Sequence, residues 1–173
     1  PVSDIPIKMG SPRKYIRHRS VLSVTMSVER GLLLLSNPLC MLILKSCLAR
    51  SSHLYKVEIC HFIVNGNHIH MVFVVINPKD AKNFIGHFKA EVAHRINIIF
   101  GWKKRTIWCE GYDSPVVLTP RRALIAIAYL YANPAKDNLE DTIDLFPGLS
   151  SWKMFIKGEH KKSWAFVRRP AFG

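Results

Sequence analysis

The segment that most constrains the fold is His68-Ile69-His70 together with the apolar run that follows, Met71 to Ile76. Residues i and i+2 of a β-strand point to the same face, so we expect the two imidazoles side by side and Ile69 on the opposite face. A second strand-like run, Lys56 to Val64, is separated from the histidines by Asn65-Gly66, a dipeptide preferred in two-residue hairpin turns. The histidine pair therefore opens the second arm of a predicted β-hairpin.

The rest of the chain alternates strand and helix patterns. The expected elements are a strand at 21–28, a helix starting at Ser36-Asn37-Pro38, the hairpin strands, an amphipathic helix at 78–100, a strand at 106–112, and a helix from Thr119-Pro120 to Tyr131. This order, βαββαβ plus an additional helix, predicts an α+β fold with a ferredoxin-like (RRM-like) antiparallel sheet and its helices on one face. The 173 residues fit one domain, 1–173, with a basic N-terminal segment (about 1–20) and a basic C-terminal tail (about 153–173).

Charge points to a polyanionic partner. The chain has 25 Lys+Arg against 12 Asp+Glu, a formal net charge of +13, and the basic residues recur along its length. Such a distribution favours DNA or RNA over an acidic membrane surface. No apolar stretch reaches the roughly 20 residues needed to span a bilayer, and no secretory signal pattern is present, so we expect no membrane association and a cytoplasmic setting.

The four cysteines lie in apolar segments without Cys-x-x-Cys spacing; they are Cys40, Cys47, Cys60 and Cys109. We expect buried free thiols, no disulfide and no structural zinc.

A tyrosine-bearing helix follows the histidine pair along the chain. In Tyr129-Leu130-Tyr131-Ala132-Asn133-Pro134, the Asn-Pro step predicts the helix end, and Tyr129 and Asn133 share a face at i and i+4. A packed core tyrosine and a simple helix stop are the alternative interpretations. With the histidine pair present, we favour Tyr129 as a nucleophile and His68, His70 and Asn133 as metal ligands, because a tyrosine attacking a phosphodiester needs a cation to neutralise charge.

His61 is a further candidate. If Asn65-Gly66 forms the turn, His61 lies directly opposite His70 on the same face. A hydrogen-bonded strand histidine is the alternative that we favour for it.

Several motifs in this order resemble one known family. They are Asn67-His68-Ile69-His70-Met71-Val72-Phe73, Phe88-Lys89 to Asn97, Trp108 to Ser114, Tyr129 to Lys136, and Ser150-Ser151-Trp152. Together they resemble the REP-associated tyrosine transposases, which belong to the single-tyrosine HUH transposases of insertion sequences. The similarity covers about Val21 to Trp152; one departure is Asn65-Gly66, where the family usually has Met-Pro.

The resemblance implies a metal-dependent endonuclease and strand transferase. It would act on single-stranded DNA at REP-like hairpins through a 5′-phosphotyrosine link, with His68, His70 and Asn133 holding Mg²⁺ or Mn²⁺ and Tyr129 as the nucleophile. The implied partner is DNA with a hairpin and a single-stranded flank, in the bacterial cytoplasm and at the nucleoid when bound. We expect a monomer, with a homodimer as the alternative. A noncatalytic nucleic-acid-binding module and a His-x-His metal hydrolase are the other functions considered.

Recognition of DNA is less sharply encoded. The basic residues that we expect to contact phosphates are Arg13, Lys14, Arg17, Arg19, Lys103, Lys104, Arg105, Arg121 and Arg122. Each run on its own is equally typical of a solvated surface.

Overall fold

The computed structural model describes residues 16–29, 32, 37–159 and 164. Arg13 and Lys14, the start of the basic N-terminal segment and most of the basic tail lie outside the described residues. The elements are β1 (Ser20–Ser27), α1 (Pro38–Tyr55), β2 (Val57–Val64), β3 (His68–Val75), α2 (Pro78–Ile99), β4 (Val116–Val117), α3 (Pro120–Lys136) and α4 (Trp152–Ile156).

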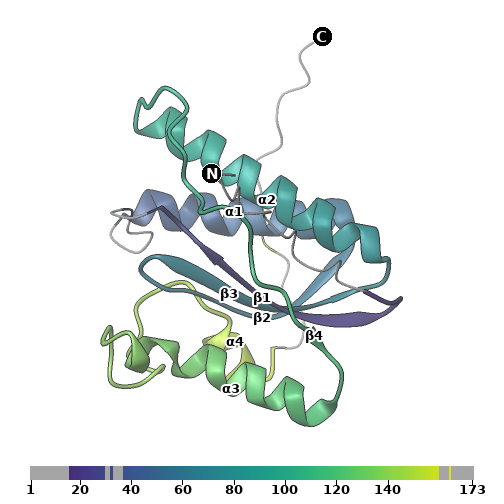
Figure 1. The fold of residues 1–173 in the computed structure, drawn as a ribbon. Helices are drawn as coiled ribbons and strands as arrows, with labels where there is room; N and C mark the ends of the chain where they lie inside the picture. The colour runs from purple at the N-terminus through teal and green to yellow at the C-terminus, as the bar shows by residue number, and fades with distance from the viewer. Residues whose placement is uncertain (1–15, 30–31, 33–36, 160–163, 165–173) are drawn as a thin grey trace, which may run out of the picture.

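The four strands form one antiparallel sheet in the order β2-β3-β1-β4. Helices α1 and α2 cover one face, and α3 and α4 lie against the other (Figure 1). The predicted α+β, βαββαβ arrangement with an additional helix is therefore confirmed. The additional helix lies across the sheet from the two crossover helices, so the described part of the protein has three layers.

Each long helix begins as its sequence predicts. The side chains of Asn37, Asn77 and Thr119 accept hydrogen bonds from backbone N–H groups in the first turns of α1, α2 and α3, and proline follows each cap. Such a cap contributes about 1 kcal/mol, and proline at the first position has a backbone angle already suited to a helix. The starts of all three helices are therefore determined by the capping residue and the proline that follows it.

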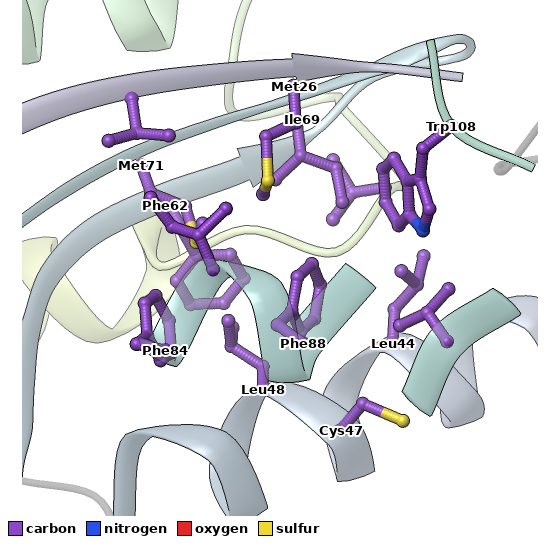
Figure 2. Close-up of a cluster of buried hydrophobic side chains, with 14 of the residues drawn as sticks. Met26, Leu44, Cys47, Leu48, Phe62, Ile69, Met71, Phe84, Phe88 and Trp108 are labelled. Carbon is purple, nitrogen blue, oxygen red and sulfur yellow. The ribbon is translucent and has the colours of Figure 1, made fainter. Parts of the chain in front are cut away.

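The main hydrophobic core lies between the sheet and the α1–α2 layer. Figure 2 shows Phe84 and Phe88 from α2 beside Leu44 and Leu48 from α1, beneath side chains of the sheet. Phe84 and Phe88 are 0% and 1% exposed, and each contributes about 1.5–3 kcal/mol by burial. This packing fixes the sheet on which the histidines stand.

The alternation of β3 assigns its two faces to different layers. Ile69, Met71 and Phe73 are buried toward α1 and α2. Val72, on the other face, packs in a second cluster with Leu130 of α3. His68 and His70 share the face of Val72, so they point toward the layer that carries α3.

The predicted strand at 106–112 is wrong in detail. The segment runs antiparallel beside β1 but meets it only in isolated bridges, Val28 to Trp108 and Thr25 to Asp113, and regular pairing begins at Val116–Val117. Between the bridges, Cys109–Tyr112 stands opposite only two β1 residues, and Gly111 takes a φ of +75° there. The extra residues bulge away from the sheet, which is why an apolar pattern that looks strand-like does not form a continuous strand.

The hairpin turn also differs from the prediction. The N–H of Asn65 donates to the carbonyl of His68, so Gly66 and Asn67 form the turn. Val64 pairs with Ile69 instead of Asn67, and His61 therefore stands opposite Val72, not His70. His61 still shares the face of His70, two positions further along the sheet.

The cysteines all carry free thiols, but they are not all buried. Cys40 and Cys47 are buried on α1, where burial raises the pKa of Cys47 to about 11. Cys60 is exposed because it lies at a β-bulge, where the β2–β3 register shifts between Ile59 and His61. Among the described residues, none of the helices has the length and apolar character required to cross a membrane.

Candidate functional site

The two histidines of β3 stand side by side at one end of the sheet. The ring centroids of His68 and His70 are 4.7 Å apart with the planes at 85°. His70 pairs across the sheet with Thr25 and His68 with Ser27. The strand period thus produces the predicted pair, and the flanking apolar residues on the other face hold it in place.

Each ring is oriented by a hydrogen bond at its Nδ1 atom. His70 Nδ1 lies 2.8 Å from Thr25 Oγ1, and His68 Nδ1 lies 2.8 Å from Asn67 Oδ1. When the Nδ1–H donates to such an oxygen, the other nitrogen, Nε2, carries the lone pair that suits a metal ion. In that tautomer the two Nε2 atoms are the candidate metal donors, and the Nε2 of His68 also lies 3.1 Å from Asn65 Nδ2, a contact that a bound ion would replace.

Both imidazoles are held in the neutral form. Burial lowers the pKa of His70 to about 4, with the nearby His68 and Lys136 as smaller causes. Burial also lowers the pKa of His68, while Asp137 and a hydrogen bond with Asn133 oppose that shift. His68 Nε2 is 3.7 Å from Asp137 Oδ2, but because burial dominates, this contact is a polar one at neutral pH and not an ion pair. Neutral imidazole is the ligand form for a metal.

Helix α3 brings Tyr129 to the histidines. The Tyr129 ring centroid is 5.9 Å from that of His70, with the planes at 80°. Tyr129 is 50% exposed, whereas Leu130 beside it is buried in the second cluster. The helix is thus anchored by its apolar face, and Tyr129 stands at the edge of that face, beside a histidine and open to a large substrate. A packed core tyrosine does not describe this residue.

Asn133 lies one turn after Tyr129, and its amide repairs the helix. Pro134 has no N–H, so the carbonyl of Leu130 would lose its helical partner. The Asn133 Nδ2 group donates to the carbonyls of Tyr129 at 2.8 Å and of Leu130 at 3.3 Å. The predicted helix end at Asn-Pro is therefore wrong, because α3 continues through Pro134 to Lys136.

That extra turn places two charged residues in the site that the sequence did not indicate. Lys136 Nζ lies 4.0 Å from the centroid of the Tyr129 ring, and Asp137 follows beside His68. Asn65, fully buried, joins them: its Nδ2 is 3.1 Å from His68 Nε2 and 3.3 Å from Asp137 Oδ2. Lys136 and Asp137 follow Tyr129 by seven and eight residues, a spacing of about two helical turns. This spacing predicts that they lie near Tyr129 only if the helix continues past Pro134.

The donor set fits a divalent ion. No cluster of three or more histidine, cysteine, aspartate or glutamate side chains forms a metal site in the part of the chain that the structure describes, so an ion bound by the two histidines would need the amide of Asn133 or water as further ligands. Asn65 Oδ1 is buried without a hydrogen-bond partner, an acceptor whose partner a bound ion or water could supply. Two neutral imidazoles with an amide oxygen suit Mn²⁺ better than Mg²⁺.

Tyr131 and His61 form a separate network. The Tyr131 hydroxyl is 2.8 Å from His61 Nδ1 and 2.9 Å from Ser151 Oγ. Ser151 Oγ in turn accepts from the N–H of Phe62, which docks the Ser150-Ser151-Trp152 segment on β2. These residues tie α3 to the sheet, so His61 is the hydrogen-bonded strand histidine that we favoured.

The predicted DNA-contacting residues are dispersed. Arg17 and Arg19 are exposed just before β1, and Arg121 and Arg122 are exposed in the first turn of α3. Lys103, Lys104 and Arg105 are exposed beyond the end of α2, which covers the opposite face, and Arg105 stacks on Trp102 at 4.5 Å. Among the predicted residues that the structure describes, Arg121 and Arg122 belong to α3, the helix that carries Tyr129.

Comparison with known proteins gives one family and several similar solved structures. The family model described as IS200-like transposase matches residues 29–126. A solved structure of a REP-associated tyrosine transposase bound to a REP hairpin matches with a TM-score of 0.75 at 18% identity, covering 92% of this chain and 93% of that one. A tRNA(His) guanylyltransferase from Saccharomyces cerevisiae matches with a TM-score of 0.51 at 13% identity, covering 76% and 66%. No curated protein sequence matches the chain.

Proposed function

Because this chain belongs to the IS200-like transposase family, we propose that it cuts and rejoins single-stranded DNA beside a hairpin, with Tyr129 as the nucleophile. The observation that carries the proposal is the placement of an exposed Tyr129 ring 5.9 Å from His70, within one chain. The structural likeness to a transposase bound to a REP hairpin supports a hairpin as the substrate.

In the proposed reaction the Tyr129 hydroxyl oxygen attacks a phosphorus atom of the DNA. A tyrosine–phosphate bond forms at the 5′ end of the fragment 3′ to the cut, and the bond from phosphorus to the 3′ oxygen of the other fragment breaks. The proton lost by the tyrosine hydroxyl is balanced by the one that the 3′ oxygen gains to become a 3′-OH. A divalent ion held by His68, His70 and Asn133 would polarise the phosphoryl oxygen and offset its charge. Thr25 and Asn67 keep both rings oriented, and burial keeps them neutral.

Lys136 places a positive charge next to the proposed nucleophile, Tyr129. Its ammonium lies over the Tyr129 ring, so it favours the negative charge that accumulates on the attacking oxygen and the phosphate. Asn65 and Asp137 both contact the Nε2 atom of His68 and bond to each other, so they would hold that ring in place.

The complete constellation comes from a single chain. The second cluster of α3 with β2 and β3, and the hydrogen bonds of Tyr131, bind the tyrosine helix to its own sheet. We therefore propose that a monomer is competent for cleavage. We also propose, from the family to which the chain belongs, that it acts on DNA in the cytoplasm.

The test is the covalent intermediate. The inverted repeats nearest the coding sequence supply candidate hairpins, which are labelled on the 5′ or the 3′ side of the single-stranded flank and incubated with the protein and Mn²⁺. We expect a protein–DNA band that survives denaturation and contains only the fragment 3′ to the cut. Tight hairpin binding without any such band would favour a noncatalytic binding module.

A further inference from the structure

Two hollows meet beside the candidate active site at the edge strand β4. One, of about 330 Å³, is bordered by His70 and Tyr129. The other, of about 450 Å³, is bordered by Arg17, His18 and Arg19. Val116 and Val117 line both, so the two hollows lie next to each other along β4, one at the basic end of β1 and one at the proposed nucleophile.

The hollow beside Tyr129 has mostly apolar walls. Val116 and Val117 form its sheet side, and Ile125 and Ala126 its helix side, with Arg122 among its charged and polar members. Ile125 is 59% exposed; it precedes Tyr129 by four residues and so shares its face of α3. The volume lies in the range of small-ligand pockets.

The place of this hollow limits what can fill it. If Tyr129 attacks a phosphate beside His70, a nucleotide next to that phosphate reaches the hollow that both residues line. The apolar walls suit the flat face of an unpaired base, and Arg122 and the arginines at the far end suit the phosphates.

We propose that the hollow lined by Val116, Val117 and Ile125 holds one unpaired nucleobase adjacent to the cut, with the strand continuing toward Arg17 and Arg19. This inference rests on the proposed function, because it places the base relative to the phosphate that Tyr129 attacks. The walls offer mainly aliphatic contacts, which form few hydrogen bonds with a base. We therefore expect binding to depend on the presence of a base and only weakly on which base it is.

A double-mutant cycle between protein and DNA tests the proposal. Ile125→Ser removes an apolar wall, and Leu124→Ser, at a neighbouring residue 68% exposed and outside both hollows, is the matched control. On the DNA, each flank nucleotide of a cleaved hairpin is replaced in turn by an abasic residue. The readout is the single-turnover rate of adduct formation with Mn²⁺, with hairpin affinity and melting temperature measured for each variant.

We expect one abasic position next to the cut to slow adduct formation about tenfold, the size of one base contact. Changing the identity of that base should have a smaller effect. Ile125→Ser should slow the reaction to a similar degree on intact DNA and add little on the abasic substrate, because both changes remove the same contact. Leu124→Ser should react like the wild type.

Two outcomes overturn the inference separately from the proposed function. If wild type forms adduct but all abasic positions react alike, or if the losses from Ile125→Ser and the abasic residue multiply fully, the hollow holds no base and the nucleophile assignment stands. If wild type forms no adduct on any hairpin, the proposed function fails and the base site fails with it.

Discussion

Lys136 Nζ lies 4.0 Å from the centre of the Tyr129 ring, although seven residues separate them in the chain. The contact exists because α3 passes Pro134 and completes a further turn. The helix thereby places a cation on the face of the residue that we propose as nucleophile.

Replacing this cation should slow the chemistry and spare binding. We expect Lys136→Met to reduce the rate of adduct formation about tenfold, because the developing negative charge loses a neighbour. Lys136→Arg should retain much of the rate, since it keeps the charge. Single-turnover rates are compared with hairpin affinity and melting temperature; an equal loss in Lys136→Met and Lys136→Arg at full stability would show that charge is not the cause.

The histidine pair should be needed for the metal ion and not for the fold. We expect His68→Ala and His70→Ala to abolish Mn²⁺ binding in calorimetry and to abolish adduct formation, with hairpin affinity largely intact. His94→Ala, an exposed histidine on α2, is the control and should resemble wild type. Loss of the cooperative melting transition in both β3 variants would instead identify the pair as structural.

Asn133 has a structural and a proposed metal-binding role, and these can be separated. Asn133→Ala leaves the Leu130 carbonyl unpaired and should lower the free energy of unfolding by about 1 kcal/mol. In Asn133→Ala with Pro134→Ala, the restored N–H can pair with that carbonyl and recover stability. We expect Mn²⁺ affinity and adduct formation to stay low in the double variant; their full recovery would limit Asn133 to shaping the helix.

Basic residues near α3 should govern the salt dependence of binding. If Arg122 contacts one phosphate, Arg122→Ala should reduce the slope of log affinity against log salt by about 0.7–0.9. Lys82→Ala, an exposed lysine on α2, should leave the slope unchanged. The slopes are measured by fluorescence anisotropy with a labelled hairpin; identical slopes for both variants would place the DNA away from Arg122.

The sequence predicts the local elements of this fold well. The starts of α1, α2 and α3 follow from Asn37, Asn77 and Thr119 before proline, and the shared face of His68 and His70 follows from the strand period. These features depend on chemistry within a few residues, so a linear pattern contains them.

Features set by distant pairing escaped prediction. The regular part of β4 depends on how β1 accommodates the bulge at Cys109–Tyr112. The hairpin turn is a local feature, but the pairing of Val64 with Ile69 moves it one residue from the turn that Asn65-Gly66 predicts. Likewise, a proline usually ends a helix, but α3 continues to Lys136, and the side chain of Asn133 bonds the Leu130 carbonyl that Pro134 cannot pair. The sequence pattern therefore did not predict Lys136 and Asp137 as site residues, although it did predict the two histidines and Tyr129.

The most direct test of the account compares two tyrosines on one helix. Tyr129→Phe and Tyr131→Phe each remove one hydroxyl; that of Tyr131 bonds His61 and Ser151, so its loss should affect stability more. With Mn²⁺ and a cleavable hairpin, we predict a denaturation-resistant adduct on the 5′ end of the downstream fragment for wild type and Tyr131→Phe, and none for Tyr129→Phe at unchanged hairpin affinity. Adduct formation by Tyr129→Phe at the wild-type rate would contradict the central claim.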